Sequence, residues 1–224
     1  MTQLHSPDQC RSGTGLPDIA MPAALLFDCD GTLLLTGDLH FKAISDALLQ
    51  QGARMTRDWY MALTGMGRDD LFARFRSEHP VALDLPRATS DSIAQTVLNA
   101  AAARENPTVV NLARKAHGRL PMAVVTNSEA PIAEAFLAAT GLRHLFDLVI
   151  TREDARDPKP APDLYLTAAA RLGVARQDCI VLEDSAEGLH AATACGMRGY
   201  DVRLPGWPMQ ADALIQTLAS LPMR

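Results

Sequence analysis

Lysine is scarce in this sequence: only Lys42, Lys115 and Lys159 occur among 224 residues. The net charge is −5 and basic residues form no cluster, which argues against a surface for nucleic acid or for an anionic membrane. Apolar runs never reach the length that spans a bilayer, and the N-terminal stretch lacks the basic segment and apolar core of a secretion signal. We therefore expect a soluble, cytoplasmic protein.

Cysteine pairs with the spacing of metal or redox sites are also absent. The four cysteines, Cys10, Cys29, Cys179 and Cys195, are scattered, and we expect them to be small reduced core residues. Residues 1–21 mix polar residues, Gly and Pro without periodicity, which predicts a flexible leader with no function of its own. Because 48% of its residues are hydrophobic, the chain can bury a sizeable core.

Strand and helix signals alternate along most of the chain. We expect strands at 24–27, 121–125, 148–150, 180–182 and 200–202, and helices at 109–117, 130–139, 163–172, 187–195 and 211–221. Such alternation predicts an α/β fold with a parallel sheet that is covered by helices on both faces.

Residues 36–106 have a different character. Apolar residues there follow helical spacing, and no strand signal is present. A helical block inserted just after the first strand predicts a cap over a site at the end of that strand. We therefore expect a core domain made of 22–35 and 107–224, and a helical cap domain made of 36–106.

Acidic residues follow two of the predicted buried strands. Asp28 and Asp30 end the first strand, and Glu183 and Asp184 end the strand at 180–182. An Asp-Gly turn or an acidic helix cap would explain one of these acids but not all four. Because the carboxyl ends of parallel strands meet at one edge of a sheet, the four acids would repel each other without a hard cation. Mg²⁺, which prefers oxygen ligands, is the expected ion.

Three further residues are candidates for holding a phosphate group. Thr126 and Asn127 end the strand at 121–125 and precede a helix, whose N-terminus attracts anions. A helix cap is the alternative role for such residues. Lys159 lies between two prolines that restrict the backbone, and its charge would offset the repulsion between a phosphate and the carboxylates. A solvated loop lysine is the alternative.

In chain order, these four segments resemble the signatures of the haloacid dehalogenase superfamily of aspartate-nucleophile phosphotransferases. The resemblance implies a Rossmann-like core with an inserted cap. It implies that Asp28 is the nucleophile, that Asp30 is the general acid and base, and that Lys159 neutralises the phosphoryl group. It also implies that Mg²⁺ is bound by the Asp28 carboxylate, the Asp30 backbone carbonyl and Asp184. Glu183 would lie beside the ion, as a ligand or through water.

Within the superfamily, the chain most resembles the β-phosphoglucomutase group, which includes small sugar-phosphate phosphatases. His40 stands where that group has a cap-hinge histidine, and Arg68 belongs to its substrate-facing cap loop. Arg68 would grip a second phosphate or sugar oxygens by its planar fork. The alternatives are an exposed arginine at a helix start and a histidine packed at a helix beginning.

The sequence therefore predicts an Mg²⁺-dependent phosphatase that acts on a small phosphorylated metabolite, a sugar phosphate. Dehalogenase members lack the second aspartate, so Asp30 favours phosphate chemistry. A mutase of the β-phosphoglucomutase type is an alternative, although no lysine lies between Lys42 and Lys115 to match the cap lysine of the mutase. A catalytically idle ligand-binding relative is a second alternative, supported only by Leu35 where the group usually has aspartate.

Overall fold

The computed structural model describes residues 21–63 and 65–224. The predicted leader, apart from Met21, lies outside the described residues, as does Cys10. The centre of the fold is a parallel sheet in the order β5-β4-β1-β6-β7. Its strands are β1 (Ala24–Phe27), β4 (Met122–Val125), β5 (Leu148–Ile150), β6 (Cys179–Glu183) and β7 (Arg198–Asp201).

Five helices of the core follow these strands in sequence. They are α5 (Pro107–Ala116), α6 (Ala130–Ala139), α7 (Asp163–Leu172), α8 (Ala186–Ala194) and α9 (Trp207–Ala219). Helix α9 begins four residues before the predicted start at 211, because Gly206 caps it and a proline occupies its first turn. The α/β fold with a parallel sheet is thus confirmed.

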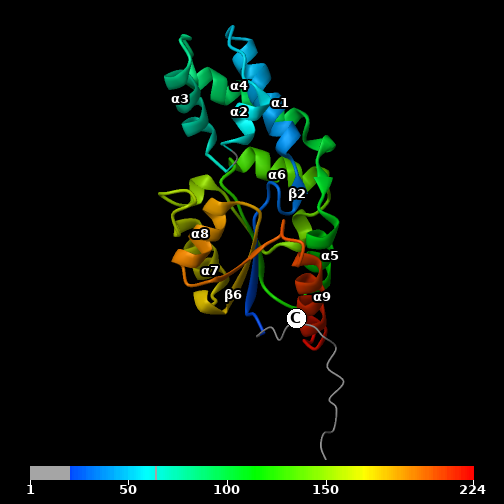
Figure 1. The fold of residues 1–224 in the computed structure, drawn as a ribbon. Helices are drawn as coiled ribbons and strands as arrows, with labels where there is room; N and C mark the ends of the chain where they lie inside the picture. The colour runs from blue at the N-terminus through cyan, green and yellow to red at the C-terminus, as the bar shows by residue number, and fades with distance from the viewer. Residues whose placement is uncertain (1–20, 64) are drawn as a thin grey trace, which may run out of the picture.

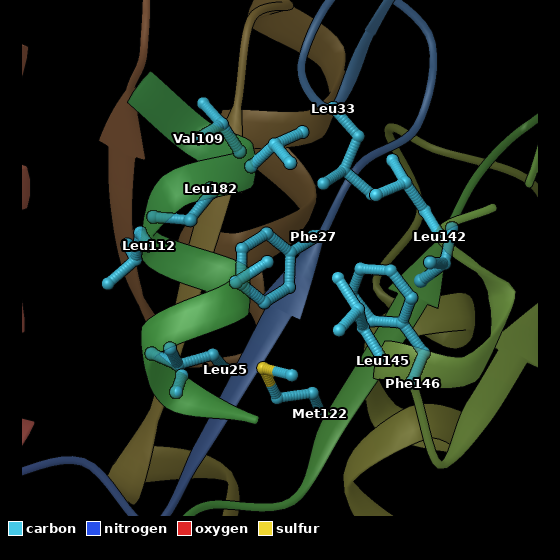
Figure 2. Packing of buried hydrophobic residues seen from close by; sticks show 14 of the residues in the cluster. Leu25, Phe27, Leu33, Val109, Leu112, Met122, Leu142, Leu145, Phe146 and Leu182 are labelled. Atoms are coloured by element: carbon cyan, nitrogen blue, oxygen red, sulfur yellow. The ribbon is translucent and has the colours of Figure 1, made fainter. Parts of the chain in front are cut away.

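Strand β1 lies in the middle of the sheet and is fully buried. Successive side chains of a strand point to opposite faces. Leu25 and Phe27 therefore pack toward α5, α6 and α9, whereas Leu26 packs toward α7 and α8. Figure 2 shows Leu25 and Phe27 against α5, with Phe146 beside the Phe27 ring. A strand held from both faces and both edges keeps its carboxyl end in a fixed place.

Four helices form a separate layer beyond one end of the sheet (Figure 1). They are α1 (Gly37–Leu49), α2 (Arg57–Met61), α3 (Arg68–Glu78) and α4 (Leu85–Leu98), which we call the cap helices. Leu48, Phe72 and Phe75 are central to an apolar cluster of their own. The cap helices therefore have a core that is distinct from the two clusters of the sheet.

Two very short strands join the cap helices to the sheet. Strand β2 (Leu34–Leu35) pairs antiparallel with β3 (Arg104–Glu105), outside the main sheet. The expectation of no strand within 36–106 is therefore wrong for β3, because two residues are too few to show an alternating pattern. Short 3₁₀ turns occupy Ala100–Ala102, Arg143–Leu145, Arg152–Asp154 and Arg176–Asp178. None of the helices in the described part of the chain is long and apolar enough to cross a membrane.

Candidate active site

A buried lysine lies at the carboxyl ends of three adjacent strands. The Nζ of Lys159 donates to Asp28 Oδ1 at 2.7 Å, to Glu183 Oε1 at 2.6 Å and to the backbone carbonyl of Val125 at 2.7 Å. An ammonium group has three protons, so these bonds use all of them. The side chain is 3% exposed, so it is held as a fixed charge between the two carboxylates.

Charges in this cluster change one another's pKa values. Burial alone would lower the pKa of Lys159, but Asp28 and Glu183 raise it well above its usual value, so the lysine stays protonated. Burial and the charges of Glu183 and Asp184 raise the pKa of Asp28. Burial and Glu183 raise the pKa of Asp184 to about 6. An excess of negative charge therefore remains after Lys159 has been counted.

Glu183 is completely buried, and both of its oxygens accept hydrogen bonds. Oε1 accepts from Lys159 and from the hydroxyl of Tyr165 at 2.9 Å. Oε2 accepts from the backbone N–H groups of Asp184 and Ser185 and from the Ser185 hydroxyl. Burial alone would raise the pKa of Glu183, but Lys159 and these donors lower it. Glu183 is thus an ionised carboxylate whose contacts orient the lysine.

The carboxylates also suit a hard cation. Asp28, Glu183 and Asp184 each offer an oxygen, and these three oxygens lie within 4.8 Å of one another. Asp28 Oδ2 and Asp184 Oδ2 have no hydrogen-bond partner among the described residues, whereas both Glu183 oxygens are engaged. An all-oxygen donor set with excess negative charge fits Mg²⁺. The side chain of Asp30 does not join this group.

Gly31 allows Asp184 to approach the first strand. Its φ of +89° is a left-handed conformation that residues with a Cβ rarely adopt. A Cβ at this position would lie 2.0 Å from Asp184 Oδ2. The juxtaposition of Asp28 and Asp184 therefore depends on the glycine between Asp30 and Thr32.

Asp30 points away from the lysine, toward the cap helices. Its Oδ1 accepts from the Thr36 hydroxyl at 2.7 Å and lies 2.8 Å from His40 Nε2. Its Oδ2 accepts from the Ser128 hydroxyl at 2.6 Å and from Thr126 at 3.4 Å. Burial would raise the pKa of Asp30, but His40, Ser128 and Thr36 hold it well below the usual range. In this arrangement Asp30 is ionised, because three neighbours bind the carboxylate form.

The side-chain amide of Asn127 is hydrogen-bonded to the backbone of the loop that carries Lys159. Its amide donates to the Lys159 carbonyl at 3.0 Å and accepts from the Lys159 backbone N–H at 2.9 Å. Thr126 accepts from the backbone N–H of Ser128. Asn127 therefore fixes the loop that carries the lysine, and Thr126 lies beside Asp30.

Arg68 begins helix α3 and is buried, not exposed. Nε donates to Glu129 Oε1 at 3.1 Å, and Nη1 donates to the Ser92 hydroxyl at 3.1 Å. Nη2 lies 3.3 Å from Nδ1 of His40. Because a guanidinium can only donate, Nδ1 is the acceptor, and Nε2 of His40 is the nitrogen that donates to Asp30. Arg68 thus links the cap helices to the start of α6 and, through His40, to Asp30.

These groups line one pocket of 310 Å³ between the sheet edge and the cap helices. Its floor contains Asp28, Lys159 and Asp184. The cap helices contribute mostly apolar lining, with Ile44 and Leu71 among it. All the residues predicted for the site line this pocket except Glu183, which lies behind Lys159.

Sequence reasoning missed five contributors to the site, namely Thr32, Thr36, Ser128, Glu129 and Tyr165. Thr32 and Ser128 stand inside two of the four sequence segments, so their hydroxyls were a usable signal. Tyr165 lies on α7, and no local pattern distinguishes it from an ordinary core residue. The contact of Glu129 with Arg68 joins residues 61 positions apart, which no local pattern reveals.

Known proteins match most of the chain. A family model for haloacid dehalogenase-like hydrolases matches residues 22–196. The fructose-1-phosphate phosphatase YqaB of Escherichia coli K12 is 38% identical over 185 residues, which cover 81% of this chain and 97% of YqaB. The crystal structure of CbbY from Rhodobacter sphaeroides with phosphate has a TM-score of 0.74 and 30% identity, and covers 80% of this chain and 85% of CbbY. A putative β-phosphoglucomutase from Thermotoga maritima has a TM-score of 0.63 and 25% identity, with 79% of this chain and 83% of that one covered. The chain therefore belongs to the haloacid dehalogenase-like hydrolases, and it is a phosphoric monoester hydrolase of that family.

Proposed function

We propose that this protein is an Mg²⁺-dependent phosphatase that hydrolyses a small sugar phosphate through an aspartyl phosphate on Asp28. The observation that carries the proposal is the cluster of oxygens from Asp28, Glu183 and Asp184 within 4.8 Å, with Lys159 bonded to the first two. The names of YqaB, a fructose-1-phosphate phosphatase, and of other relatives support a sugar phosphate as the substrate.

In the first step, an oxygen of Asp28 bonds to phosphorus while the bond from phosphorus to the ester oxygen breaks. Lys159 lies against Asp28 and offsets the charge of the phosphoryl oxygens. Asp28 and Asp184 would hold Mg²⁺, which supplies further neutralisation of those oxygens when bound.

Because Asp30 is ionised in the arrangement described above, it must first take up a proton from solvent, which it would then give to the departing ester oxygen. In the second step it takes a proton from a water molecule, whose oxygen bonds to phosphorus as the bond to Asp28 breaks. Thr36, His40 and Ser128 orient this carboxylate between the pocket and the cap helices. The products are the free sugar and inorganic phosphate, and Asp28 is regenerated.

The three cysteines that the structure describes, Cys29, Cys179 and Cys195, are buried free thiols. Buried thiols without disulfides suit a reducing compartment, and we extend the proposal to a cytoplasmic enzyme.

The test is release of inorganic phosphate from fructose 1-phosphate, glucose 1-phosphate and an aryl phosphate, with Mg²⁺ and with a chelator. We expect turnover only with Mg²⁺, and at least a thousandfold loss in Asp28→Asn, because an amide cannot act as the nucleophile. Isomerisation of glucose 1-phosphate without net phosphate release would indicate a mutase. No turnover of any ester would indicate an idle relative, and either result would overturn the proposal.

A further inference from the structure

The positive charges that face the pocket are already bound. The described lining contains three basic side chains, namely His40, Arg68 and Lys159. All three protons of Lys159 are used within the protein. Arg68 is paired with the carboxylate of Glu129, and its side chain and that of Glu129 are only 5% and 10% exposed. Neither cation is therefore free for an anionic group at the far end of a substrate.

Glu129 lies at the start of α6, on the same pocket wall as Thr126 and Ser128. Its carboxylate faces the space between the sheet edge and the cap helices, where the part of a substrate remote from the phosphoryl group must lie. A second phosphate or a carboxylate at that point would meet a negative charge as well as a neutralised arginine. Like charges repel strongly where side chains are largely buried, as Glu129 is, so Glu129 disfavours a dianionic end.

The Arg68–Glu129 pair is nevertheless suited to hydroxyl groups. Three of the five N–H bonds of Arg68 contact Glu129, Ser92 and His40, which leaves two donors. Oε2 of Glu129 has no hydrogen-bond partner among the described residues, which leaves an acceptor. A hydroxyl both donates and accepts, so the pair can bind it fully. The remaining lining from the cap helices, such as Ile44 and Leu71, is apolar and favours an uncharged group.

We propose that Glu129 determines specificity by neutralising Arg68, so that the pocket selects phosphate monoesters whose other end is an uncharged polyol and rejects bisphosphates. This inference rests on the proposed function, since it assumes that the phosphoryl group of the ester lies at Asp28. It concerns the opposite end of the same substrate, which the phosphatase chemistry leaves open.

The test is a comparison of two ligands that differ only in the remote phosphate, fructose 1-phosphate and fructose 1,6-bisphosphate. Binding to the full-length Asp28→Asn protein is measured by calorimetry with Mg²⁺, so that neither ligand is consumed. We expect the monophosphate to bind at least tenfold more tightly. Equal or tighter binding of the bisphosphate overturns the inference, and so does failure of the monophosphate to bind. This measurement needs no change at Glu129 and so does not depend on the folding of a Glu129 variant.

A second measurement assigns the selectivity to Glu129. Glu129→Gln, added to the Asp28→Asn protein, keeps the size of the side chain and removes its charge. We expect the ratio of the dissociation constants of fructose 1-phosphate and fructose 1,6-bisphosphate to shift at least tenfold in favour of the bisphosphate. Glu134→Gln removes the same charge from the exposed face of α6 and serves as the matched control, with no expected shift. Adding Arg68→Met to Glu129→Gln is expected to remove the gain, because the released guanidinium causes it. An unchanged ratio in Glu129→Gln overturns the inference.

Failure of the proposed function gives a different pattern. If the protein with native Asp28 releases no phosphate while the ratio of dissociation constants still favours the monophosphate and responds to Glu129→Gln, the phosphatase proposal fails and the specificity inference stands. If phosphate is released but the ratio shows no preference, only the specificity inference fails.

Discussion

Two buried cations, Lys159 in the core and Arg68 at the base of the cap helices, make a useful comparison. Both are nearly inaccessible to solvent, and both have carboxylate partners. The partners of Lys159 all come from strands of one sheet or their immediate ends. The partners of Arg68 come from α1, α4 and the start of α6, and thus from both the cap helices and the core.

Lys159 and Arg68 are therefore held in place in different ways. Strands β1, β4 and β6 are paired through backbone hydrogen bonds, so the geometry around Lys159 persists whatever the cap helices do. The Arg68 network exists only while the cap helices lie against α6. The contacts of Lys159 therefore depend on the sheet alone, whereas the contacts of Arg68 require the cap helices to lie against the core.

The largest expected effect comes from Lys159→Met. Breaking a buried ion pair from one side leaves uncompensated carboxylates, which costs about 3–5 kcal/mol of unfolding free energy. We also expect phosphate release to fall at least a thousandfold, because Asp28 loses its neighbouring charge. Urea unfolding and a phosphate assay measure the two effects, with the exposed Lys115→Met as control. A variant as stable as the unchanged protein would show that the contacts of Lys159 do not stabilise the fold.

Arg68→Met is expected to have the next largest effect, about 2–3 kcal/mol, which is below the range for a deeply buried pair because Glu129 lies at the boundary of the cap helices. Amide hydrogen exchange should become faster in α3 and α4 and stay unchanged in β1 and β6. Arg76→Met changes an exposed arginine on the same helix and is the control. Faster exchange throughout the sheet would contradict the distinction between the two cations.

Gly188→Ala tests the contacts of Lys159 through its partner Glu183. An exposed helical glycine usually gains stability on mutation to alanine. Here a Cβ would lie 1.7 Å from Glu183 Oε1, so Glu183 must move and its bond to Lys159 must change. We expect a loss of about 1–3 kcal/mol. Gly37→Ala in α1, where a Cβ meets nothing within 4 Å, should instead be neutral or slightly stabilising, as thermal unfolding would show.

The smallest effect is expected for the exposed ion pair between the cap helices and the core. Asp69 in α3 lies 3.4 Å from Arg152, and both side chains are accessible to solvent. Exposed pairs contribute about 0.2–1 kcal/mol and are screened by salt. We expect Asp69→Asn to lower the unfolding free energy by about 0.5 kcal/mol or less, with no difference in 1 M salt. A difference that persists in 1 M salt would show that this pair, and not only Arg68, holds the two layers together.

The core was largely predictable from local patterns. The strand at Ala24–Phe27 and the helices at 130–139 and 163–172 have the expected bounds, because short apolar runs, Gly stops and Pro starts mark them. The acids at the strand ends converge because parallel strands with crossover helices place their carboxyl ends at one edge.

The cap side of the site was not predictable in the same way. Three of the five N–H groups of Arg68 are bound by Glu129, Ser92 and His40, and the sequence did not indicate these contacts. These partners come from three separate helices, so their meeting depends on how α1, α3 and α4 pack over the sheet. Asn127 similarly contacts Lys159 across 32 positions. Such contacts are set by tertiary packing, which residue spacing does not encode.

The β2–β3 ribbon pairs the two chain segments that run between the sheet and the cap helices. Leu34 pairs with Glu105 and Leu35 with Arg104, and Asn106 donates from its backbone to the Leu33 carbonyl at 2.8 Å. The backbone N–H of Gly31 donates to the Leu34 carbonyl at 2.7 Å, so the ribbon is also hydrogen-bonded to the loop that follows Asp28. The only backbone path from the sheet to the cap helices among the described residues therefore runs through this ribbon, which is hydrogen-bonded to the loop that carries Asp30.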